Sequence, residues 1–215
     1  MRARDLSLRG SRGWVFQGVD LDVPAGGLAA VGGIAGSGRT ALLLALGGRM
    51  RPSGGTAVIG THRIPRDLRA VQRVAALGIV PGVTDLDPAL TVGEHVSEAL
   101  DLHEGLLGRW RGRRGRVRAA LERAGIGGLD PKTLAEDLAP DEAQLLGVAL
   151  ALVGEPGLLL LDDVDEGLPF ERQRELWRRL RAVADAGVTV VASCHDLGPA
   201  AEFAAPVRLL EEVRR

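Results

Sequence analysis

The chain has 215 residues, of which 46% are hydrophobic, and a formal net charge of −1 at pH 7. This length suits one domain over residues 1–215 with a substantial core, and the near-neutral charge argues against a protein dedicated to binding nucleic acid. A single cysteine, Cys194, excludes an internal disulfide and fits a reducing compartment. No segment approaches the roughly 20 apolar residues of a membrane-spanning helix, so any membrane role must go through a partner.

Strand and helix patterns alternate along the chain. Strands are expected over residues 6–8, 15–23, 28–31, 56–60, 75–80, 157–161 and 188–193. Helices are expected over residues 41–46, 94–103, 117–125, 141–152 and 171–184. The last two strands are continuous apolar runs, which is typical of a parallel sheet buried on both faces. The alternation predicts a doubly wound α/β fold.

Residues 105–119 look like a loop and are strongly basic. Such a segment could contact lipid headgroups or an acidic partner. Charge runs are usually solvated faces, however, and we favour that simpler interpretation here.

A glycine-rich turn joins the strand over 28–31 to the helix over 41–46. Glycines let backbone N–H groups close on phosphate oxygens, and the helix N-terminus adds a positive dipole. The turn fits the template G-x-x-x-x-G-K-[ST], except that Arg39 stands at the lysine position. The residues expected to hold a phosphate are Gly33, Ile34, Ala35, Gly36, Ser37, Gly38, Arg39, Thr40 and Ala41.

Two other interpretations of this turn are open to test. Residues 36–41 also satisfy the looser dinucleotide pattern G-x-G-x-x-A, which requires an acidic residue about 20 positions later. No Asp or Glu occurs between Asp22 and Asp67, so we set a dinucleotide site aside. The remaining alternative, in a chain with 30 glycines, is a turn that binds nothing.

Three polar residues follow the two long apolar strands: Asp162, Asp163 and His195. Ligands of open α/β sheets bind at the carboxyl ends of the strands, so these side chains should meet the glycine turn there. The hydroxyl of Thr40 and the carboxylate of Asp162 are suited to share a Mg²⁺ ion. Capping of the strand end is the alternative role for Asp162 and for His195.

The order of these features resembles the nucleotide-binding subunit of ABC transporters over nearly the whole chain. Residues 138–142 fall where the family's signature belongs, residues 158–162 look like its Walker B strand, and residues 193–197 look like its switch region. The resemblance implies a P-loop NTPase fold. That fold has a RecA-like core, an antiparallel β subdomain and a helical subdomain inserted at about residues 84–153.

The same resemblance implies a function. The chain would bind ATP and Mg²⁺ and couple them, with weak hydrolysis, to a membrane permease. It would pair with a second nucleotide-binding subunit as a homo- or heterodimer, in the cytoplasm of a bacterium, held at the inner face of the membrane through its partner. Asp163, orienting the attacking water, and His195, bonding the γ-phosphate, would be its catalytic residues.

The chain also departs from the family pattern at several positions. The departures are Arg39 for lysine, Gly82 for glutamine, Ala139, Pro140 and Asp141 for the signature serine and glycines, Asp163 for glutamate, and Pro169 for aspartate. They predict an impaired ATPase. They leave two alternatives open: an inactive nucleotide-sensing or structural regulatory subunit, and a P-loop kinase.

Two further expectations concern the edges of the site. The carboxylates of Asp141 and Glu142, at the start of a predicted helix, are expected to repel a phosphate there. The position of the aromatic residue that stacks on adenine in the family falls near Gly10. Trp14 and Phe16 are the available substitutes, although core packing is expected for both.

Overall fold

Two sheets organise the structure, a computed structural model that describes residues 1–104 and 112–209. The first sheet is antiparallel, with strand order β2-β1-β4-β5. Its strands are β1 (Arg2–Gly10), β2 (Gly13–Asp22), β4 (Gly54–Ile59) and β5 (His62–Ile64). The second sheet is parallel, with order β6-β7-β8-β3-β9. Its strands are β3 (Leu28–Gly32), β6 (Ala75–Leu77), β7 (Leu158–Leu161), β8 (Thr189–Cys194) and β9 (Ala205–Arg208).

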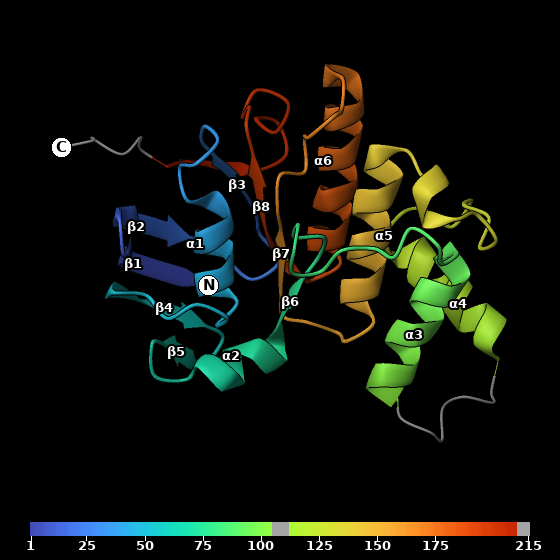
Figure 1. The fold of residues 1–215 in the computed structure, drawn as a ribbon, viewed down its shortest axis with the longest axis horizontal. Helices are drawn as coiled ribbons and strands as arrows, with labels where there is room; N and C mark the ends of the chain where they lie inside the picture. The colour runs from blue at the N-terminus through green and yellow to red at the C-terminus, as the bar shows by residue number, and fades with distance from the viewer. Residues whose placement is uncertain (105–111, 210–215) are drawn as a thin grey trace.

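The helices fill the space between the sheets and cover the far face of the parallel sheet (Figure 1). They are α1 (Arg39–Leu46), α2 (Leu68–Val74), α3 (Val92–Glu104), α4 (Arg113–Arg123), α5 (Pro140–Leu152) and α6 (Phe170–Asp185), with a 3₁₀ turn at Ala135–Asp137. Helix α1 lies between the two sheets, whereas α5 and α6 lie on the opposite side, with α3 and α4 beyond them.

Side chains of the parallel sheet alternate between two cores. Leu158 and Leu160 of β7 pack with α1 and the antiparallel sheet. Leu159 and Leu161 of the same strand pack with α5 and α6. Both faces of the strand are therefore buried, which explains why its sequence shows no polar alternation.

The parallel register brings three strand ends together. Leu161 of β7 pairs with Ala192 of β8, and Gly32 of β3 pairs with Cys194 of β8. The chain leaves all three strands at the same edge of the sheet, where the segments after β3, β7 and β8 become neighbours.

The architecture confirms the predicted P-loop fold, with its parallel core sheet and antiparallel β subdomain. Some local expectations were wrong. Helix α4 begins at Arg113, so the second half of the basic segment is helical rather than a loop. The first half, residues 105–111, lies outside the described residues. Strand β6 ends at Leu77 rather than at residue 80, because the Val80 N–H donates to Thr84 Oγ1 instead of to a neighbouring strand.

Three short elements, β5, α2 and β9, were not predicted. Strand β9 contains Pro206 and, in the sheet formed by the described residues, lies at the edge next to β3. A proline is tolerated at an edge because its missing N–H leaves no gap in the ladder. Within residues 1–104 and 112–209, no helix has the length and apolar character needed to cross a bilayer.

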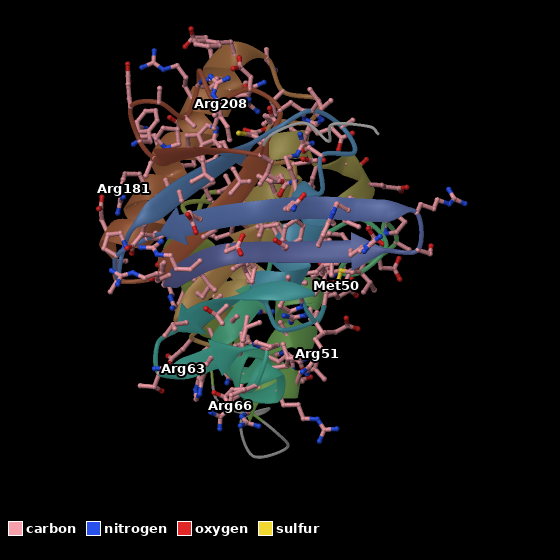
Figure 2. The ribbon with its side chains drawn as sticks, turned by 90° about the vertical axis from the view of Figure 1, so that its left-hand side faces the viewer. Met50, Arg51, Arg63, Arg66, Arg181 and Arg208 are labelled. Atoms are coloured by element: carbon pink, nitrogen blue, oxygen red, sulfur yellow. The ribbon has the colours of Figure 1, made fainter. Side chains whose placement is uncertain are left out.

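Exposed arginines gather at one edge of the antiparallel sheet. Figure 2 shows Arg51, Arg63 and Arg66 near β5 and α2. Asp67, the acid beside them, accepts a hydrogen bond from the Arg63 backbone N–H. This edge is therefore strongly positive although the whole chain is close to neutral.

Candidate functional site

Residues 33–40, which we call the phosphate loop, comprise the turn after β3 and the first two residues of α1. Gly38 has φ = +89°, and a Cβ there would lie 2.3 Å from the Val15 carbonyl oxygen. A Cβ on Gly33 would lie 2.5 Å from Ser37 Oγ. Glycine is therefore required at Gly38, because the loop lies against the backbone of β2, whereas a side chain at Gly33 would first displace the Ser37 hydroxyl.

Two buried polar atoms of this loop lack a hydrogen-bond partner among the described residues: Ser37 Oγ and Arg39 Nη1. Ser37 is 7% exposed and Arg39 is 5% exposed. An unpaired buried donor costs about 1–3 kcal/mol, so such atoms indicate a missing partner. Both lie at the N-terminus of α1, whose first turn contains no acidic residue. Donors at a helix N-terminus suit an anion, and a phosphate above all.

Thr40 and Asp162 meet beside the loop. Thr40 Oγ1 donates a hydrogen bond of 2.6 Å to Asp162 Oδ2, and Ser193 Oγ donates one of 2.6 Å to Asp162 Oδ1. Asp162 directly follows β7 and is only 2% exposed. A hydroxyl and a carboxylate are hard oxygen ligands of the kind that Mg²⁺ prefers. The described residues contain no group of three His, Cys, Asp or Glu side chains that could hold a metal ion.

Arg39 contacts both predicted catalytic residues, Asp163 and His195. Its Nη2 lies 2.7 Å from Asp163 Oδ1 and 3.0 Å from His195 Nε2. Asp163 has φ = +41°, an uncommon conformation for a residue with a side chain. The Asp163 N–H donates to Ser193 Oγ at 2.8 Å, which helps to fix the backbone.

Asp165 holds the histidine from its other side. Its carboxylate accepts hydrogen bonds from the backbone N–H of His195 at 2.8 Å and of Asp196 at 3.0 Å, and its Oδ1 lies 3.3 Å from His195 Nδ1. A guanidinium can only donate, so His195 Nε2 accepts from Arg39 and the ring proton belongs on Nδ1, facing Asp165. The result is a continuous chain of contacts: Asp165, His195, Arg39 and Asp163.

Sequence reasoning missed two residues of this site. Ser193 bridges Asp162 and Asp163, and its only signal is a hydroxyl near the end of an otherwise apolar strand. Asp165, 6% exposed, follows the two acids that were singled out and was not considered. The neighbouring Cys194 is not a nucleophile, because burial, together with the charge of Asp165, raises the pKa of its thiol to about 12.

The acids at the start of α5 are engaged by this chain's own groups. Asp141 Oδ1 lies 2.9 Å from Arg172 Nη2, and the carboxylate is buried. Glu142 Oε2 accepts a hydrogen bond of 3.0 Å from the Ala139 N–H. Asp141 therefore does not face solvent as a free charge, and Glu142 caps the helix on which it stands.

The two candidate aromatic residues differ in environment. Phe16 is buried in the core, as expected. Trp14 is 37% exposed, and the Arg9 guanidinium carbon lies 5.6 Å from its ring centroid. Gly82, at the expected glutamine position, has φ = +74° and donates its N–H to Asp85 Oδ2 at 2.9 Å.

Comparison with known proteins gives consistent matches. The family model described as "ABC transporter" matches residues 16–165. The hemin import ATP-binding protein HmuV of Rhizobium meliloti is 30% identical over 100% of this chain and 83% of its own length. The chain spans less of some other relatives: 36% of one from Streptomyces coelicolor and 58% of one from Cupriavidus metallidurans.

Solved structures share the fold. The cbiO1 protein of Clostridium perfringens, part of the ABC transporter complex cbiONQ, superposes with a TM-score of 0.81 at 22% identity, over 97% of this chain and 83% of its own. A dimeric ATP-binding cassette bound to ADP and phosphate gives a TM-score of 0.72 at 22% identity, over 97% and 93%.

Proposed function

The chain belongs to the ABC transporter family as an ATP-binding subunit, and on this basis we propose that its phosphate loop holds the phosphates of ATP while Thr40 and Asp162 hold the accompanying Mg²⁺. The observation that carries this proposal is the pair of buried, unpaired polar atoms, Ser37 Oγ and Arg39 Nη1, at the start of α1. Phosphate oxygens are the partners these atoms lack. Bound Mg²⁺ would neutralise charge on the β- and γ-phosphates.

Slow hydrolysis is the second part of the proposal. Asp163 and His195 stand where the family resemblance puts the catalytic residues, yet both contact Arg39. A carboxylate paired with a cation is a weak group for orienting water, and misplacement by about 1 Å can cost around 100-fold in rate. The same observation favours a second candidate function: a subunit that binds ATP without turning it over and so reports nucleotide to its partner.

A membrane permease is the proposed partner, docked beside β6. A cavity of about 340 Å³ lies where α2, β6, α3 and α5 come together, within the helical segment proposed for residues 84–153 and the core next to it. Its lining includes Arg49, Arg73, Asp85, His103 and Gly147. Arg63 and Arg66 of the positive edge (Figure 2) come shortly before α2 in the chain, and α2 contributes Arg73 to the cavity lining. This edge suits an acidic segment of a permease. Such docking would hold the chain at the cytoplasmic face of the membrane.

Pairing with another nucleotide-binding subunit, identical or different, is the last part of the proposal. The start of α5 lies where the family resemblance puts the signature that completes the partner's site. Because Pro140 has no N–H and Asp141 and Glu142 are bound internally, this end of the chain offers a poor completion.

The test is a calorimetric titration of the purified chain with ATP and Mg²⁺, followed by a steady-state assay of phosphate release. We expect saturable binding that is lost in Asp162→Ala when Mg²⁺ is present, because the carboxylate that holds the ion is gone. Turnover that Asp163→Ala abolishes supports the slow ATPase, and binding without turnover supports the sensing subunit. No binding at millimolar ATP would refute both.

A further inference from the structure

We propose that Arg39 and Asp163 form one length-matched pair. In this pair Asp163 is a positioning residue that aims the Arg39 guanidinium at the phosphate loop, rather than the group that orients water. The inference rests on the proposed function, since it concerns how the loop receives a phosphate. Arg39 in place of lysine and Asp163 in place of glutamate are then one coupled change rather than two separate losses of catalytic residues.

The contacts of Arg39 show how it is held. Within residues 1–104 and 112–209, Nη2 makes the contacts: it reaches both Asp163 Oδ1 and His195 Nε2. Nη1 is buried and has no partner among the described residues. The side chain is therefore anchored through Nη2, while Nη1 is enclosed with its hydrogen-bonding capacity unused within the described part of the chain. That arrangement suits a guanidinium that is fixed by protein and donates to a ligand with its remaining N–H groups.

The lengths of the two side chains explain why they occur together. An arginine places its terminal nitrogens one covalent bond farther from the backbone than a lysine does, and an aspartate places its carboxylate one bond nearer than a glutamate does. At a contact of 2.7 Å these differences offset each other. Arginine at position 39 with glutamate at position 163 would overlap. Lysine at position 39 with aspartate at position 163 would not reach contact.

The surroundings of Asp163 favour holding over catalysis. Its backbone is fixed in a left-handed conformation by the bond from its N–H to Ser193 Oγ, and Ser193 Oγ also lies 3.2 Å from its Oδ1. The same Oδ1 meets Arg39. On the far side, Asp165 braces His195, which accepts the second contact from Nη2. The guanidinium is thus held from two sides by groups that are themselves fixed.

A double-mutant cycle tests the pair through nucleotide affinity. The four proteins are the wild type, Arg39→Lys, Asp163→Glu and the double variant, titrated with a non-hydrolysable ATP analogue and Mg²⁺. We expect each single substitution to weaken binding about tenfold, because each breaks the length match, and the double variant to recover to within about threefold of the wild type. A double variant that is weakened by the product of the two single effects would overturn the proposal, since independent residues behave additively.

A second Arg–Asp pair supplies the matched control. Arg113 Nη2 lies 2.8 Å from Asp101 Oδ2 between α3 and α4, with both side chains about one-third exposed. Arg113→Lys, Asp101→Glu and their combination repeat the same chemistry away from the phosphate loop. They should leave the affinity for the analogue unchanged.

Thermal melting without nucleotide keeps the two proposals distinguishable. Each single variant at Arg39 or Asp163 should melt below the wild type, and the double variant should return towards it. If the wild type binds no analogue, the proposed function fails, while the pair is still judged by these melting points. Additive losses in melting temperature would overturn the pair even if ATP binds.

Discussion

At the scale of single residues, the two positive-φ glycines of the phosphate loop differ sharply. Gly38→Ala would push a Cβ to 2.3 Å from the Val15 carbonyl oxygen, whereas a Cβ on Gly36, at φ = +80°, would meet nothing within 4 Å. Gly36→Ala should therefore cost only the strain of a left-handed residue, about 1–2 kcal/mol. Gly38→Ala should lower the free energy of unfolding by about 3 kcal/mol or more, because β2 or the loop must move. Urea denaturation measures both, and equal losses would contradict the geometry.

Cys194 offers a second prediction at this scale. Burial, reinforced by the charge of Asp165, raises the pKa of its thiol to about 12, so almost no thiolate exists at pH 8. Iodoacetamide should leave Cys194 unmodified in the folded chain at pH 8 and modify it readily in concentrated urea, as followed by mass spectrometry. Rapid labelling of the folded protein at the same rate as in urea would show that the site is open.

At the scale of elements, helix α6 contains an acidic residue, Glu175, whose carboxylate pairs with two arginines of the next helical turn. Hydrogen bonds from Arg178 and then Arg179 lower the pKa of Glu175 from its ordinary value of 4.5 to about 2. A depressed pKa stabilises the fold at pH values above 4.5, and this contribution is lost as the pH falls towards 2. Because the Glu175 side chain is 35% exposed, Glu175→Gln should cost less than about 1 kcal/mol at pH 7.

The check is the difference in the free energy of unfolding between the wild type and Glu175→Gln, measured from pH 7 downwards. The difference should shrink below pH 4.5 as Glu175 begins to bind a proton. A difference that stays constant over this range would mean that the helix does not depend on the charge of Glu175.

The long elements of the core could be predicted from the sequence, whereas the short ones could not. Long, regular signals were enough: β7 and β8 are apolar runs between two cores, and α5 and α6 are long helices beside them. The short β5 and the edge strand β9 carry no such pattern. Strand β9 is extended because it pairs with β3, which its own sequence does not indicate. Local composition also failed to predict the start of α4. Its arginines suggested a loop, but they belong to a helix whose Val117 and Leu121 are buried.

The candidate site likewise contains residues that the sequence predicts and residues that it does not. The phosphate loop and the strand-end acids could be found because their spacing follows a template. The partners could not be found, because the fold alone brings Ser193 to Asp162, Asp165 to His195 and Arg172 to Asp141. A list of substitutions read from the sequence treats Arg39 and Asp163 as independent. Their 2.7 Å contact shows that they are not.

At the scale of the whole molecule, the question is whether two copies can close around ATP. The start of α5 would have to meet the phosphates bound by the other copy. There Pro140 has no N–H, Glu142 accepts a hydrogen bond from the Ala139 N–H, and Asp141 forms an ion pair with Arg172. We therefore expect the wild-type chain to remain monomeric with ATP and Mg²⁺ in light scattering, which would make a different nucleotide-binding subunit the better partner.

Restoring the family's signature at this helix start should reverse that result. The variant Ala139→Ser, Pro140→Gly, Asp141→Gly, Glu142→Gln regains the backbone N–H at position 140 and releases the Arg172 guanidinium from its acid. The first turn of α5 therefore gains positive potential. ATP with Mg²⁺ should then produce a dimer in light scattering. Adding Asp162→Ala to the same variant should abolish the dimer, since the nucleotide that joins the copies would lose its ion. A wild-type dimer, or a restored variant that stays monomeric although it binds ATP, would show that the start of α5 is not what limits pairing.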